Sequence, residues 1–297
     1  MKKFKFIIKP PVKKEFQKEI VKFKKKFEAK EELTEKEGEK NAKNLAKRAI
    51  KENFNRIVVV GGDGLLHQVI NGIMTEKIPE DFAIGIVPTG AGNNFAKEIG
   101  IPKDIKKAFN TIEKGKEIFV DVGKVNDKFF INCFSLGFDA KINDLANKIK
   151  ERYSFLPRNL SYLFAALKEI AVKIPDYEIE IKGLEINYQG KVVLVAITNS
   201  QSYGAIFKIN PGASVSDGKF NLCLIEPVGK IRALKDLFLA TKGKHIKMPE
   251  TKSFLFSLPL KIFSKEPLIY EMDGEVFEPE NEFKVEIFPK KIKFLVP

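Results

Sequence analysis

The residues best suited to phosphate chemistry stand at the end of a short apolar run. Four apolar residues, Ile57 to Val60, precede Gly61-Gly62-Asp63-Gly64, and apolar residues at helical spacing follow. Glycines let the backbone approach a ligand closely, and unpaired N–H groups at the start of a helix attract phosphate. Because Asp63 itself repels phosphate, we expect it either to hold a metal ion or to order the loop. Taken alone, such a turn is as often structural as functional.

A second glycine-rich segment repeats this plan further along the chain. The apolar residues Ile84 to Val87 lead through Pro88 into Thr89-Gly90-Ala91-Gly92-Asn93-Asn94. In a parallel sheet both loops emerge at the carboxyl ends of their strands, where open α/β sheets bind ligands. The hydroxyl of Thr89 and the amides of Asn93 and Asn94 suit a nucleotide. The two loops therefore predict one nucleotide-binding edge.

The elements that position these loops alternate between strand and helix in the first part of the chain. Strands are predicted at Phe4–Ile8, Glu28–Leu33, Ile57–Val60 and Ala83–Val87, and helices within 12–27, 42–50 and 65–73. A capping box of Thr34 and Glu37 is expected to open the second helix. This alternation predicts a parallel α/β domain over residues 1–122.

The pattern changes after Asp121. Short alternating segments bounded by Gly, Pro, Asn and Asp predict an antiparallel β-sandwich over residues 123–297, and the final residues either stay there or return to the first domain. The expected strands are Lys128–Phe134, Tyr177–Ile181, Lys191–Thr198, Phe220–Ile225, Leu260–Phe263, Leu268–Met272 and Phe283–Phe288. One helix is expected at Asn159–Val172, whose apolar residues either pack on the sandwich or line a lipid slot.

These segments resemble the diacylglycerol kinase catalytic family, which includes sphingosine kinases, ceramide kinases and bacterial lipid kinases. Gly61–Gly64 matches the family's G-G-D-G-T loop, and Pro88–Asn93 matches its P-x-G-T-x-N-D segment. Further matches follow in family order across almost the whole chain. They are Asp121–Gly123 (D-x-G), Asn132–Asp139 (F-x-N-x-x-x-x-G-x-D-A), Pro211–Gly218 (P-x-A-x-x-x-D-G) and Asp273-Gly274-Glu275 (D-G-E).

The resemblance implies an ATP-dependent, Mg²⁺-using kinase that phosphorylates the hydroxyl of diacylglycerol or a related lipid, in phospholipid biosynthesis. It implies catalysis between a nucleotide-binding α/β domain and a β-sandwich domain. The implied catalytic residues are Glu275 as general base, Asp121 beside it and Asp63; the implied metal ligands are Asp63 and Asp217. The implied nucleotide-binding residues are Lys9, Gly61, Gly62, Asp63, Gly64, Thr89, Gly90, Gly92, Asn93 and Asn94.

Three positions depart from the family pattern. Lys9-Pro10-Pro11-Val12-Lys13 replaces the N-P-x-x-G segment, and Lys9 supplies a positive charge where the Asn is missing. Leu65 replaces the common Thr after the first loop, as in sphingosine-type kinases. Asn94 replaces an Asp that many members carry, which keeps a polar contact and removes a charge.

Composition restricts the partners. The net charge is +13, which favours anionic partners, and abundant Lys and Glu with no Trp are typical of thermophilic proteins. Two cysteines and two histidines exclude a disulfide framework and leave little scope for zinc. Because no apolar run reaches membrane-spanning length, we expect a cytoplasmic protein, peripheral to an anionic membrane. We expect a lipid substrate and no nucleic acid, and a homodimer stays open.

Two other functions stay open from the sequence. NAD kinases also use a G-G-D-G loop, but Asn53 and Asn281, each near a Glu, lack the context of the Asn-Glu pair that such enzymes carry. The alternative is therefore an NAD kinase-like phosphotransferase, or a catalytically degenerate member that only binds nucleotide.

Overall fold

The chain forms two compact units in the computed structural model, which describes residues 2–35, 37–38, 40–153, 155–202 and 207–297. Unit 1 comprises Met1–Val120 and Lys290–Pro297, and unit 2 comprises Asp121–Pro289. The final eight residues thus belong to unit 1 although they follow unit 2 in sequence.

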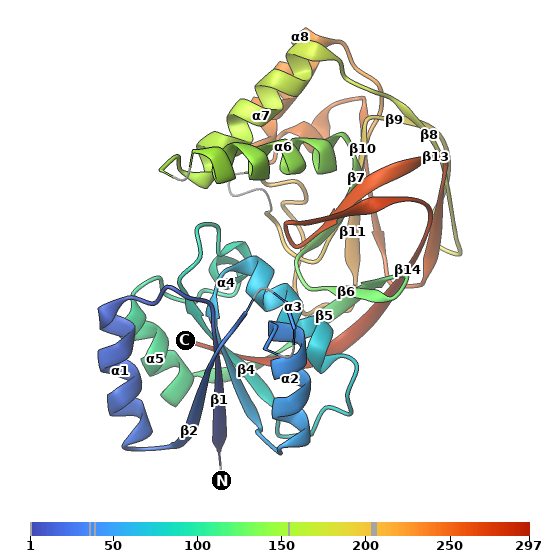
Figure 1. The fold of residues 1–297 in the computed structure, drawn as a ribbon. Helices are drawn as coiled ribbons and strands as arrows, with labels where there is room; N and C mark the ends of the chain where they lie inside the picture. The colour runs from blue at the N-terminus through green and yellow to red at the C-terminus, as the bar shows by residue number, and fades with distance from the viewer. Residues whose placement is uncertain (1, 36, 39, 154, 203–206) are drawn as a thin grey trace. The chain divides into compact units, whose positions relative to one another are not determined.

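Unit 1 is a parallel sheet with helices on both faces. Its strands are β1 (Lys3–Ile8), β2 (Glu28–Leu33), β3 (Arg56–Gly61), β4 (Ala83–Pro88) and the end of β14 (Glu275–Val296), in the order β2-β1-β3-β4-β14 with every neighbouring pair parallel. Its helices are α1 (Lys14–Lys24), α2 (Ala42–Lys51), α3 (Asp63–Ile73), α4 (Asn94–Glu98) and α5 (Ile105–Lys114). Figure 1 shows α1 and α5 on one face of the sheet and α2 and α3 on the other. This confirms the predicted α/β class.

The central strands β3 and β4 of unit 1 are almost entirely apolar because both of their faces are covered, whereas the edge strand β2 is mostly charged and exposed. Every residue of β3 and β4 is buried. Between the sheet and α5, the aromatic rings of Phe6 of β1 and Phe109 of α5 stack with their centroids 5.8 Å apart. One local prediction was wrong: α2 begins at Ala42, and its cap is Asn41, whose side chain accepts a hydrogen bond from the Asn44 N–H (2.9 Å). Asn caps a helix at least as well as Thr, so residue preference alone could not choose between Thr34 and Asn41. The choice depended on where the loop before α2 ended.

Unit 2 is built on antiparallel strands. They are β6 (Lys128–Phe130), β7 (Cys133–Gly137), β8 (Tyr177–Gly183), β9 (Asn187–Val192), β10 (Leu194–Thr198), β11 (Phe220–Ile225), β12 (Thr251–Phe256), β13 (Leu260–Met272) and β14, and β5 (Lys116–Val125) enters the unit to pair with β6 and β14. The main order is β12-β11-β10-β7-β13-β14, and β8 pairs with β13 and β9. The antiparallel class is confirmed, although two predicted strands are one: β13 runs through 264–267 with an irregular register against β14.

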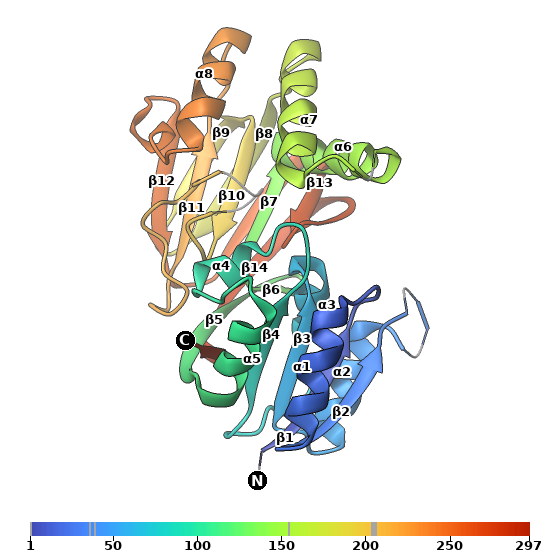
Figure 2. The ribbon, with the colours of Figure 1, turned by 90° about the vertical axis from the view of Figure 1, so that its left-hand side faces the viewer.

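In the described part of unit 2 there are three α-helices where one was expected. The predicted helix is α7 (Arg158–Val172), and the sequence analysis missed α6 (Phe138–Arg152) and α8 (Lys230–Ala240). Figure 2 shows these helices beside the strands of unit 2. The missed signal in α6 was the spacing of Phe138, Ile142 and Ala146, which are buried on one face between polar residues. In the described part of the chain, no helix has the length and apolar character needed to cross a membrane.

Candidate functional site

The first glycine loop connects β3 to α3 at the carboxyl edge of the unit 1 sheet. β3 ends at Gly61, Gly62 caps the helix in an extended conformation, and α3 starts at Asp63. A Cβ on Gly61 would lie 2.5 Å from Leu65 Cδ2, so glycine is needed for the helix to pack directly on the end of its strand. The loop thereby places its backbone at the start of a buried helix, which is a favourable position for phosphate.

The second glycine loop packs directly on the first. The parallel register places Gly61 opposite Pro88, and the Thr89 N–H donates to the Gly61 carbonyl oxygen (3.0 Å). A Cβ on Gly90 would lie 2.4 Å from the Cα of Gly62, a distance that no side chain tolerates. The two loops therefore form one continuous backbone surface, and only glycine at these positions permits it.

Asp63 joins the loops through its carboxylate. Its Oδ2 accepts the Asn94 N–H (3.0 Å) and its Oδ1 accepts the Phe95 N–H (3.1 Å). Those amides open α4, where a carboxylate is favourably placed. Of the two roles predicted for Asp63, the geometry favours the ordering of the loop.

Asn93 shapes the second loop from within. It adopts a left-handed backbone (φ 52°) and is buried. Its side chain bonds both backbone groups of Gly90: Oδ1 accepts from the N–H (3.1 Å) and Nδ2 donates to the carbonyl (2.7 Å). The sequence predicted a nucleotide-contacting amide here, but this amide is already used inside the loop. Partly exposed Thr89, Gly92 and Asn94 remain the contact candidates.

Lys9 lies at the same edge of the sheet. Its backbone N–H donates to the Val60 carbonyl (3.0 Å), directly before the first loop, and its side chain is exposed. The structure thus brings Lys9 beside the first loop despite the altered 9–13 segment, and a lysine at this position can attract phosphate.

The Asp273-Gly274-Glu275 segment of unit 2 forms the tight turn between β13 and β14. Asp273 (φ 53°) and Gly274 (φ 92°) both have positive φ, as two-residue hairpin turns of type I′ require. Asp273 is buried and accepts the N–H groups of Ile131 (3.1 Å), Asn132 (2.8 Å) and Cys133 (3.1 Å). These bonds fix the turn, and Glu275 is exposed beside it.

A buried carboxylate that sequence reasoning missed lies under this turn. Glu271 is 2% exposed, and its Oε2 accepts the Gly274 N–H (2.9 Å) and the Asn143 Nδ2–H (3.0 Å). Burial, and then the Asp139 carboxylate, raise the pKa of Glu271 from 4.5 to about 8. The available signal was an acid inside the otherwise apolar strand 268–272.

Asp121 is hydrogen-bonded to the 215–218 segment, which contains Asp217, but the two carboxylates have different surroundings. Asp121 is fully buried, and its Oδ2 accepts the Gly218 N–H (2.7 Å), while its backbone N–H donates to Val215 (2.8 Å). Asp217 is exposed and accepts the Lys219 N–H (3.0 Å). Through these hydrogen bonds Asp121 holds the 215–218 segment against β5. Its buried carboxylate is not in an open position of the kind a catalytic group would need.

The His, Cys, Asp and Glu side chains of the described residues do not form a site that could hold a metal ion without other ligands. Among the residues that the structure describes, no three His, Cys, Asp or Glu side chains form a metal-binding group. Both oxygens of Asp63 already accept backbone N–H groups. The predicted metal ligands Asp63 and Asp217 therefore do not form a preassembled metal site.

Comparison with known proteins agrees with this architecture. Residues 5–125 match the family described as "Diacylglycerol kinase catalytic domain", and residues 132–296 match "YegS C-terminal NAD kinase beta sandwich-like domain". Curated proteins named diacylglycerol kinase are similar: that of Staphylococcus carnosus is 28% identical over 77% of this chain and 72% of its own, and that of Bacillus subtilis is 28% identical over 76% and 73%.

Solved structures support the fold. The crystal structure of a diacylglycerol kinase from Bacillus anthracis has a TM-score of 0.79 at 21% identity, covering all of this chain and 97% of that one. Another crystal structure from that organism reaches 0.82 and covers 98% of its chain. The β-sandwich character predicted for the second domain is thereby confirmed.

Proposed function

Because this chain belongs to the diacylglycerol kinase family, as a diacylglycerol kinase-like enzyme, we propose that it transfers the γ-phosphoryl group of ATP to the hydroxyl of diacylglycerol or a closely related lipid. Unit 1 would bind the nucleotide and unit 2 would supply the base. The observation that carries the proposal is the close backbone packing of the two glycine loops at one sheet edge, beside the start of α3, where phosphate is favoured.

The nucleotide would be bound mostly by backbone groups. The loop glycines allow phosphate to approach, Thr89 and Asn94 are partly exposed for polar contacts, and Lys9 adds a positive charge at the same edge. Since the side chains do not build a metal site, we treat Mg²⁺ as part of the MgATP substrate, where it neutralises phosphate charge.

Glu275 is the proposed general base. It is exposed at a turn that Asp273 fixes through three backbone N–H groups, so its carboxylate is free to accept a proton while its backbone is held. In the reaction the lipid hydroxyl gives its proton to Glu275 as its oxygen bonds to the γ-phosphorus. The bond from that phosphorus to the β–γ bridging oxygen breaks, and ADP leaves.

A transfer assay with labelled γ-phosphate tests the activity and the base together. The acceptors are diacylglycerol, sphingosine and NAD, because NAD kinases share the first loop and a related second domain. We expect label in diacylglycerol or a related lipid. Glu275→Gln should lower kcat by about 10²–10⁴-fold with little change in the KM for ATP, because only proton transfer is lost. Glu278→Gln, an exposed glutamate on the same strand, is the matched control.

The contrary outcomes are separable. Label in NAD and in no lipid would replace this function with an NAD kinase-like one. If Glu275→Gln phosphorylates lipid at an unchanged rate, the lipid kinase activity would stand, but Glu275 would not be its general base.

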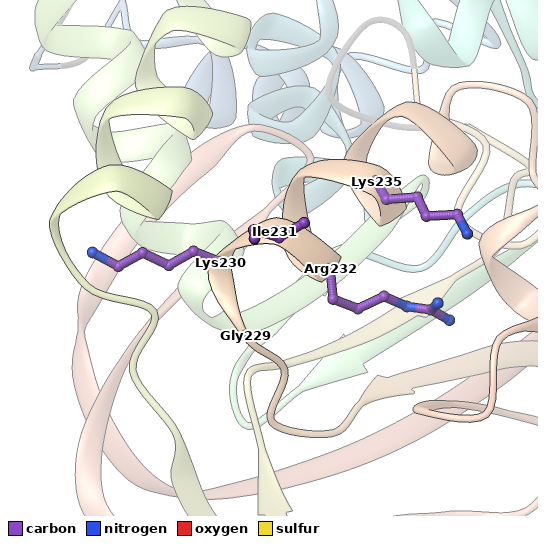
Figure 3. Close-up of a pocket in the computed structure, with 5 residues that line it drawn as sticks. All are labelled: Gly229, Lys230, Ile231, Arg232 and Lys235. Carbon is purple, nitrogen blue, oxygen red and sulfur yellow. The ribbon is translucent and has the colours of Figure 1, made fainter.

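The lipid acceptor requires access to a membrane surface, and α8 of unit 2 is the proposed contact. Figure 3 shows a pocket at its start, lined by Gly229, Lys230, Ile231, Arg232 and Lys235. Ile231 is 87% exposed beside Lys230 and Lys235, a combination that suits the boundary of an anionic bilayer, whereas Arg232 is ion-paired with Glu250. We propose that the protein acts in the cytoplasm and binds such a membrane peripherally.

A further inference from the structure

The turn that carries Glu275 is held by two buried side chains from elsewhere in unit 2. Glu271 Oε2 accepts the Gly274 N–H (2.9 Å), and Asn143 of α6 donates to the Gly274 carbonyl (3.2 Å). Asn143 Nδ2 also donates to Glu271 Oε2 (3.0 Å), which uses both of its protons. Both backbone groups of the residue before Glu275 are therefore bound by one Glu–Asn pair.

The hydrogens around Glu271 can be assigned by counting donors. Ser135 Oγ lies 2.7 Å from Asp139 Oδ2 and 3.2 Å from Glu271 Oε1, but a hydroxyl has a single proton to donate. Asp139 has the shorter contact and also accepts the Tyr162 hydroxyl, as an ionised carboxylate at the start of α6 would. Cys133 Sγ, 3.4 Å from Glu271 Oε1, is a weak donor to the same oxygen. Ser135 thus donates to Asp139, and its lone pair faces Glu271 Oε1. That contact is favourable when Glu271 Oε1 carries a proton.

We infer that Glu271 is a positioning residue, kept as the neutral acid, which fixes Gly274 and so directs the neighbouring Glu275. The role rests on the proposed function, because it takes Glu275 as the base. The chain of hydrogen bonds runs from the Gly274 N–H to Glu271, from the Glu271 hydroxyl to Ser135, and from Ser135 to Asp139. A neutral acid can complete this chain because it accepts at one oxygen and donates at the other.

The surrounding charges favour the neutral form. Among the described residues, the titratable groups that face Glu271 are Cys133 of β7, Asp139 of α6 and Asp273 of the turn. Burial raises the pKa of the Cys133 thiol, and it raises the pKa of the Tyr162 phenol that contacts Asp139, so neither contributes a negative charge near neutral pH. Burial and the Asp139 carboxylate raise the pKa of Glu271 to about 8. A second negative charge beside Asp139 would be costly.

The first test is independent of kinase activity. In the unfolded chain the pKa of Glu271 returns to about 4.5, so the unfolded state releases the proton first as the pH rises. The stabilisation is therefore complete below about pH 4.5 and lost progressively up to about pH 8. Glu271→Gln keeps an acceptor for Gly274 and a donor for Ser135 but does not titrate. From pH 5 to 8, the melting temperature of the unsubstituted protein should fall relative to that of Glu271→Gln. If the difference between the two melting temperatures stays constant over this pH range, the inference that Glu271 is neutral would be overturned.

The second test separates positioning from simple stability. Glu271→Ala should lower kcat by up to about 10²-fold, because a base displaced by a fraction of an ångström is inefficient, while the KM for ATP stays within about twofold. Glu271→Gln should restore most of the lost turnover near pH 7. Asn143→Ala should also lower kcat, which keeps the test valid if Glu271→Ala does not fold. Glu266→Gln, an exposed glutamate of the same strand, serves as the control.

The outcomes distinguish this role from the proposed function. Turnover of Glu271→Ala and Asn143→Ala equal to that of the unsubstituted protein, or a Glu271→Gln variant as impaired as Glu271→Ala, would overturn the positioning role. If the unsubstituted protein phosphorylates no lipid, the proposed function falls and the positioning role with it. The melting curves would still decide whether Glu271 is neutral.

Discussion

At the scale of single residues, Asp63 shows how a motif carboxylate can act through the backbone. Its two oxygens hold the first amides of α4, so it connects the first glycine loop to the second. A residue that only held a metal would have little effect on folding. Asp63 should instead affect both stability and nucleotide binding, because the same two hydrogen bonds fix the shape of the loop.

We therefore expect Asp63→Ala to lower the free energy of unfolding by about 1–3 kcal/mol, as unsatisfied backbone donors do. It should also raise the KM for ATP at least tenfold. Thermal melting and steady-state kinetics measure the two effects. Asp104→Ala is a matched control, since Asp104 caps α5 by accepting the Lys107 N–H (2.8 Å) and lies outside the two loops. It should cost similar stability and leave the KM unchanged. An Asp63→Ala variant of unaltered stability would contradict the loop-ordering role.

At the scale of elements, the two strand–loop–helix segments of unit 1 work as a pair. β3 and β4 are neighbours in parallel register, so their loops meet at one edge, and glycine backbones face each other there. The consequence is a small surface formed by closely packed backbone, which needs no long side chains. In unit 2, buried Asp273 and Glu271 hold the tight β13–β14 turn through hydrogen bonds to backbone N–H groups.

Gly90→Ala tests this backbone packing directly. The added Cβ would lie 2.4 Å from Gly62 Cα, so the loops must move apart, and we expect a KM for ATP raised at least tenfold together with a lower melting temperature. Gly229→Ala is the control, because its Cβ would meet no atom within 4 Å and its φ is negative. Normal nucleotide kinetics in Gly90→Ala would show that the close approach of the loops does not matter for binding.

At the scale of the whole molecule, charge and exposed apolar residues govern how the protein meets its substrate. The net charge of +13 attracts anionic surfaces over the Debye length. Ile231 and Phe238 of α8 are 87% and 61% exposed, and Val172 at the end of α7 is 68% exposed. These two helices pack against each other in unit 2, where Lys230 donates to the Val172 carbonyl (3.2 Å).

Sedimentation with lipid vesicles measures this association. Binding should be stronger to vesicles that contain anionic lipid than to neutral ones, and should weaken as salt rises from 50 to 500 mM, values chosen to span the screening range. Ile231→Asp combined with Phe238→Asp should reduce binding severalfold. Leu184→Asp is the control, because Leu184 is 88% exposed in the β8–β9 turn, away from α8. Equal loss in the control would indicate a general charge effect instead of a contact through α8.

Features that depend on neighbouring residues could be predicted from the sequence. Apolar runs ending in glycine predicted the two loops, and the change from helical to alternating spacing predicted an α/β domain followed by an antiparallel one. Tertiary structure decided which polar groups are available. Asn93 is consumed inside its own loop, Asp121 is buried against Gly218, and Glu271 meets Asn143 from 128 positions away. Burial and hydrogen-bond partners of a carboxylate depend on long-range strand and helix packing, which local spacing does not encode.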